Sequence, residues 1–267
     1  MLISTCMTAF VALTAMAAEG LDRAKLEACL DKKDSKTIVQ AFKDNEEDVL
    51  PFFDEYLEGG LAAIEKNEPR AVTDERFARG VAFAKLADEA LSGNVFSNYA
   101  NAFAAWKPEQ QKQFREGQNE FRKGREVLAK QPEQALVHFK KSLVLCEPLG
   151  DAWGQAMCLS KIAAAHAAMG NHAPAIEAAT AAFEVNKGLH LVSPQTSDLI
   201  LRAECRAKSG KKEDCEKDLV AAMALTKRIK DEKRAAAMKK RCAEVYRQNG
   251  NKDVADAIEK EISSGKK

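Results

Sequence analysis

The chain has 267 residues, of which 46% are hydrophobic and 30% are charged, and its 41 basic and 40 acidic side chains leave a formal net charge of +1. This composition is ordinary for a folded protein and excludes a collagen-like or low-complexity chain. The balance hides an asymmetry, because residues 19 to about 100 are acidic whereas residues 202–241 are rich in lysine and arginine. Most of these charges are expected to lie on solvated helix surfaces.

An uncharged apolar segment, MLISTCMTAFVALTAMAA, forms residues 1–18 and ends in Ala15-Met16-Ala17. The charged run EGLDRAKLEA follows at once, so the apolar stretch is short, and its last small residues suit signal peptidase. We therefore expect a signal peptide at residues 1–18 and an exported protein, periplasmic or extracellular, that meets a membrane only if this segment is retained. The segment departs from the usual pattern because it lacks a basic residue near its start, and a retained anchor or a buried first helix is the alternative.

Residues 19–107 have the pattern of helices separated by short breaks rich in Asp, Asn, Gly and Pro. The expected helices are LDRAKLEACL, SKTIVQAFKD, EDVLPFFDEYLEGGLAAIEKN, TDERFARGVAFAKLADEAL and NVFSNYANAFAAW. Ser35 and Thr73 are their N-cap candidates. The aromatic residues concentrate in this region and are expected to form a core. The region is either a set of degenerate repeats or a helical cap for the array that follows.

Four segments of the remaining chain match one another at a fixed offset of 40 residues. Three positions carry the match: turn residues, small residues five positions later, and residues seven positions before each turn, which are Lys130, Gly170, Gly210 and Gly250, then Ala135, Ala175, Cys215 and Ala255, then Lys123, Ala163, Ala203 and Ala243. Each segment predicts a helix, a tight turn and a second helix, because apolar residues recur at helical spacing. Small residues allow the two helices to approach closely, and glycine ends the first helix in a left-handed conformation.

The segments MGNHAPAIEAATAAF and NGNKDVADAI place a glycine-containing turn before a small residue on the second helix. In this they resemble the tetratricopeptide repeat family, in a longer-helix variant, and the resemblance covers about residues 108–263. It implies an all-α, right-handed helical-repeat solenoid, preceded by the helical region at 19–107 and followed by a disordered tail at 264–267. The period exceeds the family's usual 34 or so residues, and HEAT-like repeats of about 40 to 47 residues are the alternative.

The resemblance also implies where a partner binds. In this family the first helices line a concave groove that holds a peptide or helix, and the matching positions are Ser160, Ala164, Ala167, Ile200, Glu204, Lys208, Lys240, Glu244 and Arg247. The family's carboxylate clamp is not reproduced, because Ser160 and Ala164 stand where a lysine and an asparagine are needed. We therefore expect a protein or peptide partner of mixed charge that does not dock through its C-terminal carboxylate.

The sequence contains no HExxH, CxxC, GxSxG or glycine-rich phosphate loop. Its four histidines lack the spacing of a zinc site. We expect a non-catalytic protein without cofactor or metal. The alternative is an enzymatic or ligand-binding domain at residues 19–107, which requires a pocket with convergent polar groups and shifted pKa values. Nucleic-acid binding by residues 202–241 is disfavoured, because the basic residues alternate with acids and lack stacking aromatics.

Six cysteines follow the predicted signal peptide: Cys29, Cys146, Cys158, Cys205, Cys215 and Cys242. Export would permit disulfides, and the even number allows complete pairing. Several of these cysteines occupy small, buried columns, however, where a free thiol behaves as a small hydrophobe. Cys205 and Cys215 flank the turn at Gly210 on two antiparallel helices, and this pair is the first to test for a cross-link.

Overall fold

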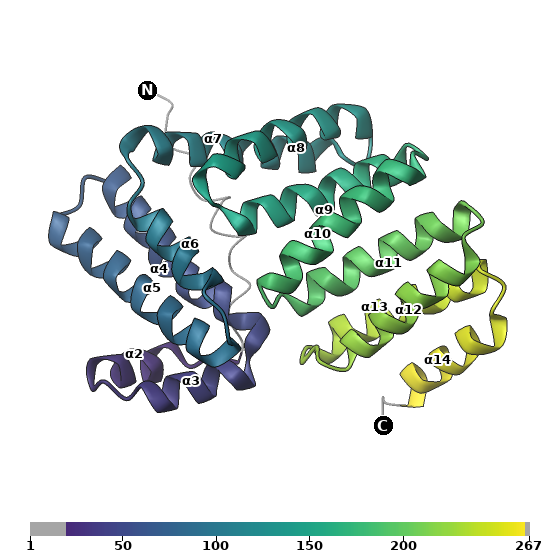
Figure 1. Cartoon of the computed structure of the whole chain (residues 1–267), viewed down its shortest axis with the longest axis horizontal. Helices are drawn as coiled ribbons and strands as arrows, with labels where there is room; N and C mark the ends of the chain where they lie inside the picture. The colour runs from purple at the N-terminus through teal and green to yellow at the C-terminus, as the bar shows by residue number, and fades with distance from the viewer. Residues whose placement is uncertain (1–19, 265–267) are drawn as a thin grey trace. The chain divides into compact units, whose positions relative to one another are not determined.

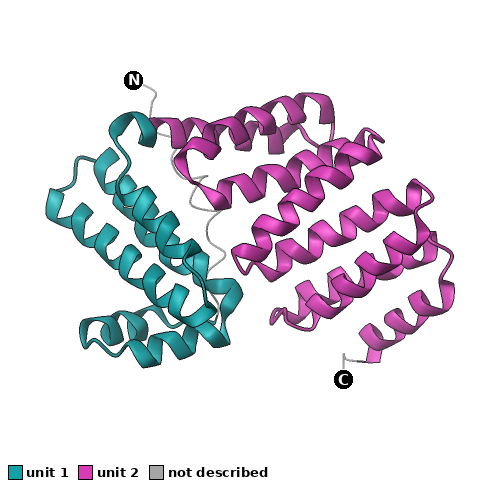
Figure 2. Cartoon of the chain, viewed as in Figure 1, with its two compact units in different colours: residues 1–111 teal, residues 112–267 magenta. Residues whose placement is uncertain are grey.

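The computed structural model describes residues 20–264, so the predicted signal peptide and the end of the predicted tail lie outside the described residues. Within this range the protein is all-α, with thirteen α-helices that pack sequentially in antiparallel pairs (Figure 1). The chain divides into two compact units, residues 1–111 and 112–267 (Figure 2). The units meet inside α7 (Pro108–Val127), whereas the sequence places the boundary just before that helix.

None of the helices in residues 20–264 is long and apolar enough to span a membrane.

The first unit contains five helices that match those expected from the sequence within a few residues at each end. They are α2 (Arg23–Asp31), α3 (Ser35–Asp44), α4 (Glu46–Glu65), α5 (Arg70–Leu91) and α6 (Val95–Ala104). Helix α5 packs against α3, α4 and α6. Six aromatic side chains of this unit are at most 1% exposed: Phe42, Phe52, Phe53, Phe83, Phe96 and Phe103. Phe52 and Phe83 meet edge to face with centroids 5.0 Å apart, so the expected aromatic core is confirmed.

Both predicted N-caps in this unit are wrong. Ser35 is the first helical residue of α3, and the cap is Asp34, whose carboxylate accepts from the Thr37 backbone N–H at 3.2 Å and from the Thr37 hydroxyl at 2.6 Å. Thr73 is buried inside α5, which begins three residues earlier after Pro69. Aspartate and serine cap equally well, and proline fixes a backbone angle suited to a helix start, so local propensity did not decide between these residues.

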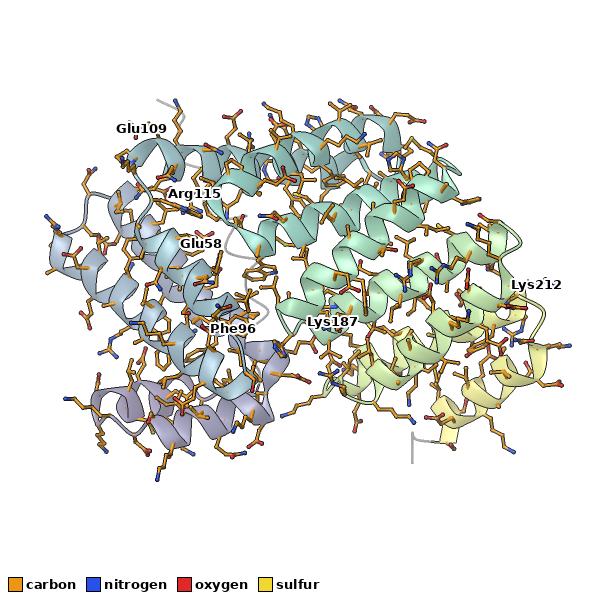
Figure 3. All side chains as sticks on the ribbon, in the orientation of Figure 1. Glu58, Phe96, Glu109, Arg115, Lys187 and Lys212 are labelled. Atoms are coloured by element: carbon orange, nitrogen blue, oxygen red, sulfur yellow. The ribbon has the colours of Figure 1, made fainter. Side chains whose placement is uncertain are left out.

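The second unit contains most of α7 and seven further helices: α8 (Pro132–Cys146), α9 (Ala152–Ala168), α10 (His172–Gly188), α11 (Val192–Lys208), α12 (Lys212–Thr226), α13 (Glu232–Gln248) and α14 (Lys252–Ser264). A 3-10 turn (Glu147–Leu149) follows α8. Helices α8, α10, α12 and α14 begin 40 residues apart, and so do α9, α11 and α13. The helix, turn and helix predicted for each of the four segments are confirmed. Figure 3 shows the side chains, with Lys187 near the end of α10 and Lys212 at the start of α12.

The small residues predicted at the helix crossings are buried. All four on the second helices, Ala135, Ala175, Cys215 and Ala255, are 0% exposed. On the first helices Ala163, Ala203 and Ala243 are also 0% exposed, but Lys123 is half-buried. Close packing in that hairpin instead depends on Gly124, because a Cβ there would lie 2.6 Å from the Phe139 ring. The larger Phe139 side chain therefore requires a residue without a side chain on α7.

Three of the four predicted turn residues have the left-handed conformation. The φ angles of Gly170, Gly210 and Gly250 are 75°, 73° and 98°, as expected for glycines that end a helix. Lys130 does not adopt a positive φ, a conformation that is less favourable for a residue with a Cβ than for glycine. Helix α7 ends at Val127 instead, and the Val127 carbonyl accepts from the backbone N–H groups of Lys130 and Gln131 at 3.0 and 2.8 Å.

Candidate partner-binding surface

Helix α11 contacts both neighbouring first helices, α9 and α13, and each of the three also contacts its own hairpin partner. Side chains bridge them. The Ser160 hydroxyl on α9 donates to Asp198 Oδ1 on α11 at 2.8 Å, and Arg241 Nη2 on α13 donates to Glu204 Oε1 on α11 at 2.9 Å. These three helices therefore form a continuous surface in the second unit, and it is the surface that the resemblance predicted for a partner.

Most of the predicted partner-binding residues are accessible on this surface. Lys208, Lys240 and Glu244 are exposed, and the half-buried positions are Ser160, Ala164, Ala167 and Glu204. Glu204 faces Arg241, which the sequence analysis missed. The surface thus presents lysines and carboxylates within a few helical turns of one another, together with small apolar side chains.

Two predicted positions require correction. Ile200 is 0% exposed and belongs to the core formed with α12 and α13, so it offers no surface to a partner. Arg247 is exposed, but its Nη1 and Nη2 donate to Glu259 Oε1 and Asp256 Oδ1 of α14 at 3.1 and 2.8 Å. These hydrogen bonds hold the pKa of the Arg247 guanidinium above its usual value. Its charge is neutralised within its own hairpin, so it offers a partner no free positive charge beside Lys240.

A buried polar cluster lies directly beneath the contact between α9 and α11. Its centre is Asp198, which is 2% exposed and accepts from Ser160 and from Asn186 Nδ2, the latter at 2.7 Å. Burial raises the pKa of Asp198 to about 6, although the two hydrogen bonds and the cations Lys161 and Arg202 oppose the rise. Burial also lowers the pKa of Lys161, and nearby Arg125 adds to this effect.

The repeat itself contains a signal for this cluster, because two polar residues stand at positions that elsewhere hold small or apolar ones. Asp198 and Asn186 occupy the positions that hold Cys158 and Cys146 one offset earlier, and Met238 and Thr226 one offset later. A carboxylate in such a column of small or apolar side chains is unusual, because a buried charge needs compensating partners.

A second buried carboxylate forms ion pairs with two arginines of the basic segment at residues 202–241. Asp218 on α12 is 3% exposed and accepts from Arg202 Nη2 and Nε at 2.6 and 2.9 Å and from Arg206 Nη1 at 2.7 Å. Arg202 Nη1 also donates to the Thr180 hydroxyl at 3.1 Å. A paired and fully hydrogen-bonded geometry of this kind is how proteins accommodate buried charge. The two arginines therefore join α10, α11 and α12 and are not a free cationic surface.

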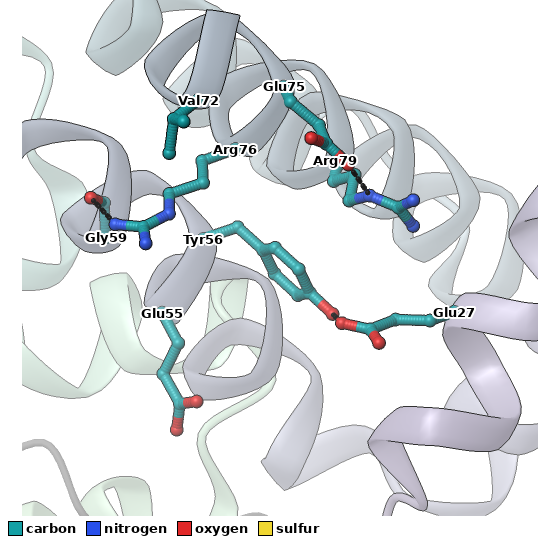
Figure 4. Close-up of a pocket in the computed structure, with 8 residues that line it drawn as sticks. All are labelled: Glu27, Glu55, Tyr56, Gly59, Val72, Glu75, Arg76 and Arg79. Atoms are coloured by element: carbon teal, nitrogen blue, oxygen red, sulfur yellow. Dashed lines mark hydrogen bonds and ion pairs between the residues drawn. The ribbon is translucent and has the colours of Figure 1, made fainter. Parts of the chain in front are cut away.

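The first unit contains a cavity of about 480 Å³ between α2, α4 and α5 (Figure 4). Its lining residues are Glu27, Glu55, Tyr56, Gly59, Val72, Glu75, Arg76 and Arg79. The Tyr56 hydroxyl donates to Glu27 at 2.5 Å, Arg76 Nη1 donates to the Gly59 carbonyl at 2.7 Å, and Arg79 Nε donates to Glu75 at 3.2 Å. Burial and Glu27 raise the pKa of Tyr56 far above its usual value, so this hydroxyl is a neutral donor. The cavity has convergent polar groups, but many of them bond to one another.

No model of a known protein family matches this chain, and no curated protein matches it. Its function must therefore be inferred from the side chains of the surface and the cavity.

Proposed function

We propose that the protein is an exported, non-catalytic scaffold that holds a peptide or helical segment of a partner protein on its first helices. In this proposal α7–α14 form a right-handed solenoid of the tetratricopeptide type. The observation that supports it most is the 40-residue spacing of helix starts together with direct contact between successive first helices. A helix pair that buries its apolar face against the next pair leaves the first helices side by side, and such surfaces bind extended partners.

The charges on this surface define the partner. Exposed Lys208, Lys240 and Glu244 lie on neighbouring helices around the Glu204–Arg241 pair. A partner segment with both acidic and basic side chains complements them, and the small residues Ala164 and Ala167 leave room for its apolar positions. Exposed charges of this kind contribute more to partner choice and association rate than to affinity.

The test is affinity capture from the native cell envelope with the wild type and with the double variant Lys208→Glu, Lys240→Glu. We expect the variant to lose the captured partner, and the wild-type complex to weaken as salt is raised, because exposed charges are screened. The matched control is Lys187→Glu, which reverses the charge of an exposed lysine on the second helix α10. Equal capture by the double variant and the wild type would contradict the proposal.

The cavity of the first unit supports a second candidate, a ligand-binding function for residues 19–107. Val72 lines the cavity and is half-buried, so Val72→Trp fills the space without removing a charged group. If the cavity is the binding site, this substitution abolishes capture while the two lysine substitutions leave it unchanged. The opposite result assigns binding to the first helices.

A further inference from the structure

Two cysteines of neighbouring helices meet in the interior of the second unit. Cys146, the last residue of α8, and Cys158 of α9 are 4% and 1% exposed, and Cys158 is close enough to Cys146 to raise the pKa of its thiol. Cys158 Sγ also donates to the Ser142 hydroxyl at 3.2 Å, and that hydroxyl donates to the Gly117 carbonyl at 2.8 Å. A Cβ on Gly154 would lie 2.9 Å from Cys146 Sγ. Gly154 lies one helical turn before Cys158 on α9, so the Cys146 thiol packs against the face of α9 that carries Cys158, and both thiols are tightly enclosed.

The same contact recurs one offset later with different chemistry. Asn186 ends α10 as Cys146 ends α8, and Asp198 lies twelve residues further on, as Cys158 lies twelve residues after Cys146. Asn186 Nδ2 and Asp198 Oδ2 are 2.7 Å apart. Helix packing thus brings this pair of positions together whatever side chains they carry. Two cysteines can be bridged only if their Cβ atoms face one another closely, and these two positions are brought together at both junctions, α8 with α9 and α10 with α11.

We propose that Cys146 and Cys158 form a disulfide that joins α8 to α9 when the chain folds in an oxidising compartment. One cysteine, as thiolate, attacks a sulfur of a disulfide reagent or a disulfide oxidoreductase, forming a mixed disulfide and expelling one thiolate. The other cysteine, also as thiolate, then attacks the protein sulfur of that mixed disulfide and expels the second thiolate. The protein loses two protons and two electrons, and the reagent disulfide is reduced to two thiols. The inference does not depend on the partner-binding surface.

The cross-link is expected to form during folding and not in the finished fold. The thiolate is the reactive species, and hydrogen bonding to Cys158, burial and the Asp151 carboxylate all raise the pKa of Cys146. The folded, reduced protein therefore exchanges slowly with disulfides in solution. An open α8–α9 pair exposes both thiols to solvent and to disulfides, and subsequent packing brings them together.

The pair suggested by the sequence lacks a comparable arrangement. Cys205 and Cys215 are buried and, like Cys146 and Cys158, are free thiols in the structure. The charged groups that act on the Cys205 thiol are Glu204 and Lys208, whereas those around Cys215 include Asp218 and Glu216. Neither of these two thiols is among the groups that shift the pKa of the other, whereas Cys158 raises the pKa of Cys146.

The experiment is refolding of the full chain from denaturant in a buffer of reduced and oxidised glutathione, followed by alkylation and peptide mapping without reduction. We expect a peptide pair joined through Cys146 and Cys158, with a mass lower by two hydrogens than the two thiol forms. We also expect a higher denaturation midpoint for the oxidised than for the reduced protein. This difference should vanish in Cys146→Ser and persist in Cys205→Ser, which removes another buried thiol.

Each outcome decides the proposal. Quantitative alkylation of both Cys146 and Cys158 after refolding to redox equilibrium overturns it, and so does a cross-link between Cys205 and Cys215 in their place. Because the mapping is done on the wild type, the result stands even if a serine variant fails to fold. Addition of oxidised glutathione to the folded, reduced protein should give markedly slower cross-linking than refolding.

Discussion

The substitution Asp198→Asn tests the polar cluster beneath the contact between α9 and α11. Asparagine keeps the shape of the side chain and an acceptor for the Ser160 hydroxyl, while Asn186 can turn its amide to offer an oxygen. The change therefore removes the titrating carboxyl and keeps the packing. Its effect on stability should depend on pH, because the pKa of Asp198 is raised to about 6 from an ordinary value of 3.8.

The sign follows from the direction of this shift. A raised pKa in the folded state means that folding favours the protonated carboxyl, so the stabilising contribution is complete below pH 3.8 and is lost as pH rises through 6. A shift of about two units corresponds to about 3 kcal/mol. Between pH 4 and pH 8 wild type should therefore lose about 2 to 3 kcal/mol that Asp198→Asn does not lose. Any constant effect of the rearranged hydrogen bonds cancels in this comparison.

The assay is urea denaturation of both proteins at pH values from 4 to 8, followed by circular dichroism. The variant should gain stability relative to wild type as the pH rises, with the gain centred between pH 4 and 6. Asp231→Asn is a control of opposite sign, because the Arg234 backbone N–H lowers the pKa of Asp231 at the start of α13. If the difference in unfolding free energy between wild type and Asp198→Asn stays constant over this pH range, the pKa of Asp198 is not raised in the folded protein and the reasoning is wrong.

Three further predictions concern packing, turns and processing. Ala175→Leu should overpack the α9–α10 crossing and cost roughly 1 to 3 kcal/mol, because Ala175 is 0% exposed, whereas Ala173→Leu on the exposed side should be nearly silent in the same denaturant melts; equal midpoints for the two variants would contradict the helix register. Gly210→Ala should cost about 1 to 2 kcal/mol because φ is 73°, whereas Gly188→Ala, in a helical conformation with open space around it, should be neutral or stabilising by up to about 1 kcal/mol. If thermal melts rank these two variants in the reverse order, Gly210 does not have the left-handed conformation described here. Intact mass of the protein recovered from its native envelope should show loss of the first 17 or 18 residues, and a chain with those residues attached would overturn the prediction of export.

Features that depend on neighbouring residues were predictable from the sequence. The offset of 40 residues gave the starts of the helices in the second unit, because helical periodicity and a glycine with positive φ are local properties. Gly170 shows this, since its turn has the predicted conformation and Ala175, five residues later, is buried. The first repeat shows where this prediction fails. Lys130 occupies the turn position there in place of glycine, and the turn has a different conformation.

The direction in which each side chain faces was decided only by the tertiary structure. Successive residues of a helix differ by about 100°, so an error of one position turns a groove residue into a core residue. Ile200 is such a case. The sequence around Ala164 is so rich in alanine that no apolar face stands out, so the orientation of the helix about its axis could not be corrected from the sequence. The pairing of Arg247 with Asp256 also required the position of α14. Asn186 with Asp198, and Cys146 with Cys158, meet across helix junctions because the helices pack there, and no local pattern reports that contact.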